Sequence, residues 1–184
     1  APEHTGFASR GWIRALLHDP SHERYFGPTE ISGMPSQDRL GNEQLTAVTE
    51  YVYSLADEPQ DHDRADATLA ATGQHVFESK CMECHMFDGD GDYLGEGGPN
   101  LTGYASRTWL VRQIATPARD TNYGETNRMP AFADELSEHD IAMVAAFLRM
   151  QRFEAPDTGR LRGKISQRAR DRVQHHRDAH DEDD

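Results

Sequence analysis

Apolar residues recur every three or four positions in several short stretches of the 184-residue chain, and this spacing predicts amphipathic helices. In residues 68–77, Leu69, Gly73 and Val76 fall on neighbouring faces of a helix that runs into Cys81. Glycine destabilises a helix interior by about 1 kcal/mol relative to alanine. We therefore expect Gly73 to permit the close approach of a second helix.

Two more helices are predicted further along the chain. One extends from Ser106 to Thr116 and is stopped by Pro117. The other begins at Ser137, whose side chain can cap a helix with an acidic first turn. Its apolar stripe consists of Ile141, Val144, Ala145 and Leu148, with Phe147 beside it. Short helices separated by loops predict an all-α fold.

The motif Cys81-Met-Glu-Cys84-His85 has the pattern of c-type haem attachment. Each thiol can add across one vinyl group of a haem to form a thioether, and the adjacent imidazole can then coordinate the iron. A Cys-x-x-Cys redox pair would not need the histidine. A structural zinc site would need two more suitably placed ligands. The single motif predicts one covalent haem c per chain.

Residues 69–152 resemble the single-haem class I c-type cytochromes, particularly those of bacteria. Four features support the resemblance and occur in the family's order: Gly73 and Phe77 before the attachment motif, Gly98-Pro99-Asn100-Leu101 after it, Arg128-Met129-Pro130 later, and Phe147 in a last helix. The resemblance implies a cytochrome c fold, in which short helices surround one haem.

The resemblance also implies roles for individual residues. Cys81 and Cys84 would form the thioethers, and His85 and Met129 would be the axial ligands of the iron. The carbonyl of Pro99 would accept the Nδ1 proton of His85. In the family the glycine and the aromatic residue of the two end helices touch, which implies a contact between Gly73 and Phe147. Further candidates for the haem pocket are Leu101, Tyr104 and Trp109.

Met129 competes with five other methionines for the sixth position on the iron. Met82 and Met86 lie within or beside the attachment motif and cannot easily reach the opposite face of the haem. Met143 and Met150 lie in the last predicted helix, where methionine is usually a filler of the core or surface. Met129 stands in a loop far from the motif. An open or histidine-filled site is the alternative.

The first 57 residues repeat the second half of the cytochrome-like segment. Residues 5–13 (TGFASRGWI) match residues 102–110 (TGYASRTWL) at one constant offset. Gly33-Met34-Pro35 aligns with Arg128-Met129-Pro130 after a small gap. Further on, Leu40, Leu45, Val48 and Tyr51 match Leu136, Ile141, Val144 and Phe147. Ordered internal similarity of this kind indicates duplicated structure.

This N-terminal repeat, residues 1–57, contains no attachment motif. Either its other half, with a second haem, lies outside this chain, or the repeat has lost its haem and survives as a packing module. Met34 would be a haem ligand in the first case and a core residue in the second. In both cases apolar residues such as Trp12 and Val48 need cover. We therefore expect the repeat to pack on the haem unit or on another chain.

The predicted organisation is the N-terminal repeat (1–57), a polar linker (58–68), a cytochrome c domain (69–152) and a charged tail (153–184). The whole chain has 19 Lys and Arg against 32 Asp and Glu, a net charge of −13. This charge argues against nucleic-acid binding and favours a cationic redox partner. No apolar run approaches the roughly 18 residues of a membrane-spanning helix.

The function expected from these features is one-electron transfer by a carrier that has no catalytic residue of its own. Haem c is attached outside the cytoplasm in the family, so the resemblance implies an extracytoplasmic location in a respiratory chain. The partners would be redox proteins, with a membrane cytochrome complex as one of them. The alternative function is a haem peroxidase-like enzyme, or part of another haem enzyme, with an open iron site.

Overall fold

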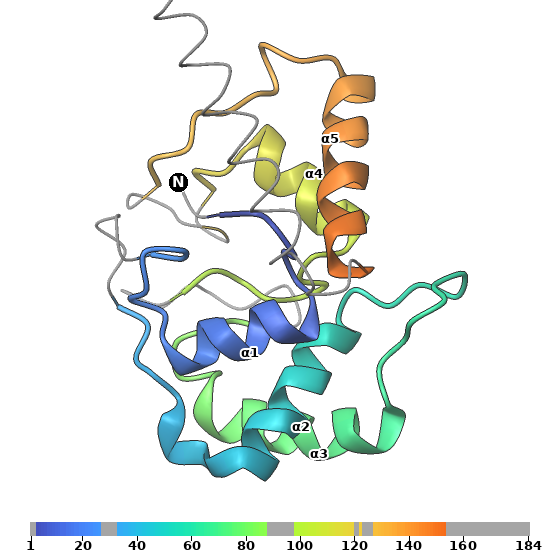
Figure 1. Cartoon of the computed structure of the whole chain (residues 1–184). Coiled ribbons are helices and arrows are strands. Elements are labelled where there is room, and N and C mark those ends of the chain that lie inside the picture. Colours follow the sequence, from blue (N-terminus) through green and yellow to red (C-terminus); the bar gives the residue numbers. More distant parts are fainter. Residues whose placement is uncertain (1–2, 27–32, 88–97, 120–121, 123–126, 154–184) are drawn as a thin grey trace, which may run out of the picture. The chain divides into compact units, whose positions relative to one another are not determined.

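The computed structural model describes residues 3–26, 33–87, 98–119, 122 and 127–153. Within these ranges the chain forms helices and no strand, so the all-α prediction is confirmed. The helices are α1 (Arg10–His18), η1 (Asp38–Leu40), α2 (Gly41–Ser54), α3 (Ala67–Lys80), α4 (Arg107–Ala115), α5 (Glu138–Met150) and η3 (Gln151–Phe153) (Figure 1). All of them belong to one compact unit, residues 1–154. The predicted tail lies outside the described residues, except for Phe153.

Side-chain caps determine where the predicted helices begin. The hydroxyl of Ser106 accepts a hydrogen bond from the backbone N–H of Trp109 at the start of α4. Ser137 caps α5 in the same way, by accepting from Asp140. These hydroxyls satisfy donors that have no partner within the helix, which explains why local sequence located both starts.

The N-terminal repeat has the same backbone geometry as the later segment that it matches. Gly6 and Gly103 have φ angles of 68° and 65°, while Ala8 and Ala105 have φ angles of 58° and 60°. Positive φ is uncommon for residues other than glycine, so two alanines at equivalent positions indicate one conserved turn. Ser9 caps α1 through the N–H of Trp12, as Ser106 caps α4.

Long-range hydrogen bonds are duplicated as well. The indole N–H of Trp12 donates to the carbonyl of Glu3 at 3.4 Å, and that of Trp109 donates to the carbonyl of Asn100 at 3.1 Å. The loop before each second helix is tied to the end of the first, by Gln37 N–H to Leu17 O and by Phe132 N–H to Ile114 O. Helix α1 packs on α2, and α4 packs on α5. We call residues 98–153 the rear segment, and the N-terminal repeat is its structural copy.

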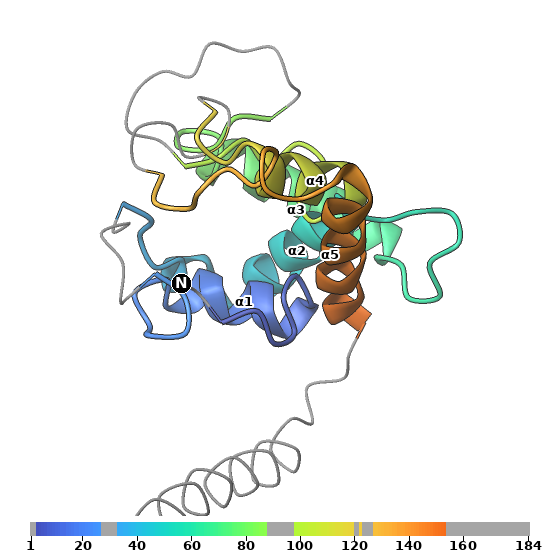
Figure 2. The same ribbon diagram turned by 90° about the horizontal axis from the view of Figure 1, so that it is seen from above.

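The most extensive helix contact joins the N-terminal repeat, through α2, to α3, the helix that leads into the Cys81–His85 motif (Figures 1 and 2). A Cβ atom placed on Gly73 would lie 1.9 Å from the carbonyl oxygen of Ala47 and 2.9 Å from the Cβ of Tyr51. Only a residue without a side chain allows the two backbones to approach so closely. The repeat therefore packs on the segment that carries the Cys81–His85 motif, which is one of the two arrangements expected from the sequence.

The expected contact between Gly73 and Phe147 is wrong, because Phe147 is 63% exposed and Tyr51 takes its place beside Gly73. Tyr51 and Phe147 are equivalent residues, so α2 and α5 offer α3 the same kind of face. Residues 55–66 connect α2 to α3, whereas residues 81–137 separate α3 from α5. Closing the shorter loop costs less conformational entropy, which favours α2.

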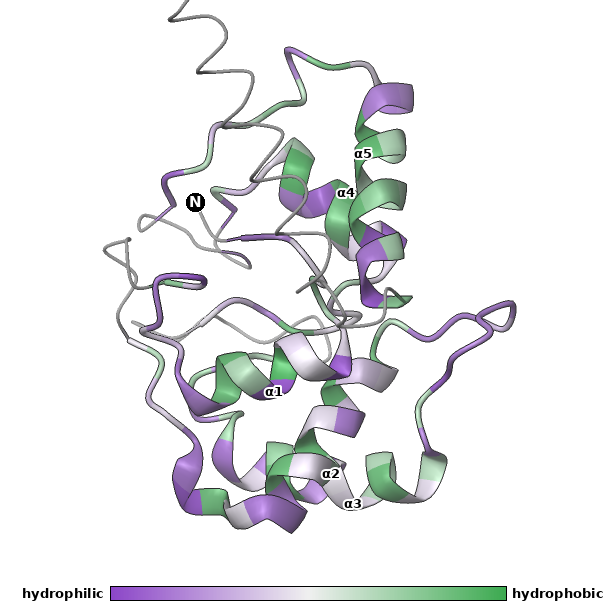
Figure 3. Cartoon of the chain, in the orientation of Figure 1, coloured by the Kyte–Doolittle hydropathy of each residue, from purple (hydrophilic) through white to green (hydrophobic). Residues whose placement is uncertain are grey.

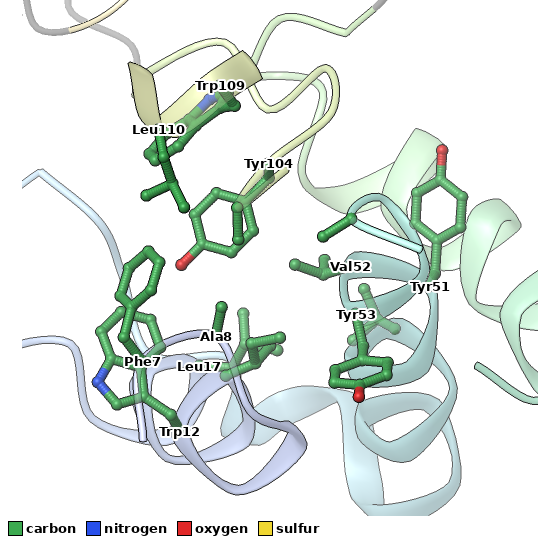
Figure 4. Close-up of a cluster of buried hydrophobic side chains, with 14 of the residues drawn as sticks. Phe7, Ala8, Trp12, Leu17, Tyr51, Val52, Tyr53, Tyr104, Trp109 and Leu110 are labelled. Atoms are coloured by element: carbon green, nitrogen blue, oxygen red, sulfur yellow. The ribbon is translucent and has the colours of Figure 1, made fainter. Parts of the chain in front are cut away.

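A single hydrophobic core unites the repeat with the rear segment. Figure 4 shows Phe7 and Trp12 on one side of this core and Tyr104, Trp109 and Leu110 on the other. All five side chains are at least 92% buried. The rear segment is therefore held against the N-terminal repeat by aromatic packing, which contributes strongly to core stability.

The predicted polar linker is an ordered part of this unit. It ends at Asp66, because α3 begins at Ala67, and its acidic residues pair with arginines from both ends of the unit. Within the linker, Asp61 accepts a hydrogen bond from Arg149 at 2.6 Å. Just before it, at the end of the N-terminal repeat, Asp57 accepts one from Arg152 at 2.7 Å.

The first helix joins the same cluster of charges. Arg10 pairs with Glu50 at 2.7 Å and with Asp63 at 2.9 Å. The guanidinium groups of Arg10 and Arg152 lie over the ring of Tyr53, at 3.9 and 4.0 Å from its centroid. These contacts connect α1, α2 and η3 through one network.

Candidate haem-binding site

The attachment motif forms one tight turn at the end of α3. The N–H of Cys81 donates to the carbonyl of Phe77 at 2.8 Å, and the N–H of His85 donates to the carbonyl of Cys81 at 2.8 Å. The side chain of Cys81 is half-buried and that of Cys84 is exposed. The turn thus presents two thiols and one imidazole within a single short segment, as thioether attachment of a haem requires.

The imidazole of His85 is oriented by the backbone of Pro99. Its Nδ1 lies 2.9 Å from the carbonyl oxygen of Pro99, and because a carbonyl can only accept, Nδ1 carries the proton. The other ring nitrogen, Nε2, then has the lone pair that a metal ion needs. A carbonyl partner of this kind fixes both the tautomer and the orientation of a ligating histidine.

Gly98 allows the Pro99 segment to lie against the ring. A Cβ atom at Gly98 would be 2.3 Å from Cε1 of His85, a distance that no side chain could tolerate. The segment is held in place by the N–H of Gly98, which donates to the carbonyl of Cys84 at 2.6 Å. The adjacent Gly98 and Pro99 therefore act together: the first permits the approach and the second supplies the acceptor.

The protonation behaviour of the motif fits a neutral ligand set. Burial lowers the pKa of His85, although the hydrogen bond to Pro99 acts in the opposite direction. Burial also raises the pKa of the Cys81 thiol to about 11, with a smaller contribution from Cys84.

The predicted pocket residues lie in the segment that follows Pro99. The N–H of Leu101 donates to the carbonyl of Met86 at 3.0 Å and thereby ties this segment to the attachment turn. Tyr104 and Trp109 are buried, with ring centroids 5.0 Å apart in an edge-on arrangement. These two rings lie in the core shared with the N-terminal repeat, where Tyr104 also meets Phe7.

The two methionine loops lie on different copies of the repeated structure. Met129 is 37% exposed, and the side chain of Asn127 hydrogen-bonds to its backbone N–H and carbonyl. Met34 is half-buried and packs against the hydrophobic core. The first α-helix after Met34 is α2, which packs on α3. The first α-helix after Met129 is α5, which contacts α4 and η3.

Two features of the site are not apparent from the sequence motifs. Phe87 packs edge-on against Phe77 at 5.6 Å and meets Tyr51 at 6.0 Å, which closes an aromatic cluster beside the attachment turn. Asn100 is 3% exposed, and its side chain accepts from the N–H of Thr102 while its carbonyl accepts from Trp109. The sequence feature that could have identified Asn100 is its position between Pro99 and Leu101.

The described part of the chain lacks two other kinds of feature. No group of three or more His, Cys, Asp or Glu side chains there could hold a metal ion. No helix in those ranges is long and apolar enough to cross a membrane.

Comparison with known proteins gives a consistent assignment. The family model described as cytochrome c oxidase, cbb3-type, subunit III matches residues 68–148. The subunit CcoP of the cbb3-type cytochrome c oxidase from Rubrivivax gelatinosus is 32% identical over 139 residues, which is 74% of this chain and 42% of that protein. The CcoP subunit from Rhodobacter capsulatus is 30% identical over 129 residues, 64% of this chain and 40% of that protein.

A third relative has a different name. One of the subunits of nicotinate dehydrogenase from Pseudomonas putida is 31% identical over 167 residues, 82% of this chain but 12% of that protein. No solved structure matches the chain. The chain spans less than half the length of each of these relatives.

The similarity extends beyond the segment that the family model matches. A match that covers 74% or 82% of the chain has to include part of residues 1–67, so the N-terminal repeat shares in it. The order of the motifs, the geometry around His85 and the family match agree with one another. Residues 68–148 therefore form a class I c-type cytochrome domain.

Proposed function

We propose that the chain is a one-electron carrier with a single haem c, bound covalently through Cys81 and Cys84. The observation that supports this most strongly is the His85 ring, whose Nδ1–H is held 2.9 Å from Pro99 O, so that Nε2 has its lone pair available. A bound haem supplies a reversible Fe(III)/Fe(II) couple. The chain would orient the proximal ligand and exclude water from it, through Gly98, Pro99 and the aromatic cluster around Phe87.

For the sixth position we propose the thioether of Met129. Its position in the Arg-Met-Pro motif of the rear segment supports this assignment. If His85 and Met129 both ligated the iron, a substrate could not reach it, which would suit a carrier and not an enzyme. The packing of α2 on α3 favours a second candidate, Met34, because its loop leads into the helix that covers the haem-bearing segment. The exposure of Met129 would also be compatible with the open site of a haem enzyme.

The proposed setting is an extracytoplasmic respiratory chain, in which the domain passes electrons to or from a membrane cytochrome complex. The family match and the CcoP relatives support this setting. The net charge of −13 favours a partner with a cationic docking surface. We also propose that residues 1–57 act as a haem-free companion of the cytochrome domain at 69–152.

A pyridine haemochrome assay combined with intact mass would test the covalent haem. We expect one haem addition per chain, and none in the double variant Cys81→Ala with Cys84→Ala. Two additions, or a colourless protein, would contradict the proposal.

Absorption spectra of Met129→Ala and Met34→Ala would identify the sixth ligand. We expect Met129→Ala to lose the weak near-infrared band of Met–Fe(III) ligation and to lower the reduction potential. Loss of the band in Met34→Ala alone would transfer the role to Met34. Absence of the band from the unaltered protein would favour an open site.

A further inference from the structure

Helix α5 carries an exposed apolar face. Met143, Phe147 and Met150 are 59, 63 and 64% exposed, and Val144 is 41% exposed. Figure 3 shows the hydrophobic positions along this helix. These residues recur at helical spacing and so form one continuous surface, which is typical of a site of interaction.

The equivalent face of α2 is buried. Ala47, Val48 and Tyr51 correspond to Met143, Val144 and Phe147 in the internal repeat, and they are 2, 0 and 8% exposed. Helix α3 covers this face. The chain therefore contains two helices with the same apolar pattern. Helix α2 is covered by α3, whereas no helix of the described residues covers α5 at the corresponding position.

The contact between α2 and α3 shows what kind of helix suits such a face. Helix α3 crosses α2 at Gly73, where the backbone carbonyl of Ala47 and the Cβ of Tyr51 occupy the space that a side chain would need. Phe77, four residues later, packs on Tyr51 with ring centroids 5.2 Å apart. A helix with any side chain at the crossing position would clash with the backbone of α2. A helix that packs on such a face therefore needs a glycine at this position.

We propose that the exposed face of α5 is a docking surface for a second helix of the α3 type, namely the first helix of another haem-bearing cytochrome c segment. Such a helix carries a glycine at the crossing and an aromatic residue four positions later. The count of segments supports this occupant: the chain has two copies of the rear pattern but one attachment motif. The inference rests on the proposed function, since it treats α3 as the haem-bearing helix.

At the position where α2 has Ala47, α5 has Met143, and this difference fits the docking role. Methionine is unbranched and adaptable, so it can rearrange around a helix that docks beside it. Phe147 offers the same aromatic contact that Tyr51 makes with Phe77. The face thus retains the features that hold α3 on α2.

The test uses the intact, haem-loaded protein and a fluorescein-labelled synthetic peptide with the sequence of residues 66–80. Fluorescence anisotropy of the peptide should rise to saturation as the protein is added. Phe147→Glu should weaken this binding at least about tenfold, because it places a charge in the contact. Gln44→Glu, which adds the same charge at an exposed site on α2, should not change it.

A change in the peptide itself gives a second, independent criterion. The Gly73→Ala peptide has a higher helix propensity than the parent peptide. It should nevertheless lose binding, because the added Cβ closes the crossing. The Thr72→Ala peptide, altered at an exposed position, should bind like the parent. If Gly73→Ala bound as well or better, helix propensity and not the crossing would explain binding, and the proposal would be overturned.

NMR spectra of the methionine methyl groups would locate the binding site. The Met143 and Met150 methyl groups should shift when the peptide binds, and that of Met82, in the attachment motif, should not. No saturation by about 1 mM peptide, or no shift of these two methyl groups, would refute the docking surface. The haem spectrum of the same samples reports on the proposed function separately, because it depends on the attachment motif and not on the peptide.

Discussion

The rings of Phe7 and Tyr104 lie 5.9 Å apart, centroid to centroid, and these two residues occupy equivalent positions in the N-terminal repeat and the rear segment. Each ring also packs edge-on against the tryptophan five positions later, at 5.1 Å for Trp12 and 5.0 Å for Trp109. The two copies of one motif therefore meet through aromatic residues at equivalent positions. Their contact joins the two halves of the core (Figure 4).

A double-mutant cycle on Phe7→Leu and Tyr104→Leu should reveal this coupling. We expect an interaction free energy of about 0.5–1.5 kcal/mol, the usual range for a tilted aromatic pair. Urea unfolding of the two single variants and the double variant provides the measurement. The combination of Phe7→Leu with Leu69→Ala, an exposed position on α3, should be additive. Additivity of Phe7 and Tyr104 would show that the two segments stabilise each other by other means.

Gly73→Ala should destabilise the protein by about 1–3 kcal/mol, because the new Cβ would meet the backbone of Ala47 at 1.9 Å. The loss should occur even though alanine is the better helix former. Gly11→Ala in α1 is the matched control, since its nearest neighbour would be Ser9 Oγ at 4.0 Å. It should leave stability unchanged or raise it. Equal effects of the two substitutions in urea unfolding would contradict the close crossing of α2 and α3.

Gly98→Ala should disturb the haem site. The added Cβ would push against His85 and break its hydrogen bond to Pro99. Loss of that bond makes the imidazole a weaker donor to the iron, so we expect a higher reduction potential and an altered absorption spectrum. Spectroelectrochemical titration measures both. Gly33→Ala, where a Cβ would meet nothing within 4 Å, should behave like the unaltered protein.

Asp61→Asn should destabilise the protein by about 1.5–3 kcal/mol, because it removes the shorter of the two ion pairs of the buried Arg149 and leaves only the longer one, with Glu58. The side chains of these two residues are 3 and 9% exposed. Asp38→Asn breaks the exposed pair with His18 and should change stability by less than about 1 kcal/mol. Thermal or urea unfolding compares the two variants. Similar small effects would show that the arginine network contributes little.

The contribution of Asp61 should also depend on pH. Burial opposes its ionisation, but the hydrogen bond from Arg149 and the one from the Glu58 N–H outweigh this, so its pKa is lowered. A lowered pKa in the folded state stabilises the fold above the ordinary value of about 3.9, and this stabilisation disappears as the pH falls through the folded-state pKa. The stability difference between the unaltered protein and Asp61→Asn should therefore shrink in acid. A constant difference down to about pH 2 would contradict the assignment.

Local residue chemistry was sufficient for much of this molecule. Ser106 and Ser137 marked helix starts because a hydroxyl that caps a helix acts on donors two or three residues away. The attachment motif and the glycine before Pro99 could be recognised from short sequence patterns, because residues of fixed type and spacing surround His85 there. The internal repeat predicted duplicated turns, and Ala8 and Ala105 have nearly the same positive φ.

The pairing of helices depended on the assembled chain. Tyr51 and Phe147 belong to the same apolar pattern. Helical spacing in the sequence identifies an apolar face, but it does not identify the segment that packs on that face. The shorter connection to α3 favours α2, so Tyr51 is buried and Phe147 is exposed. The ion pairs of the polar linker were not apparent from the sequence for a similar reason, since Arg149, the partner of Asp61, lies 88 residues away. Contacts between distant residues arise from the packing of whole segments, and that packing cannot be read from the order of residues alone.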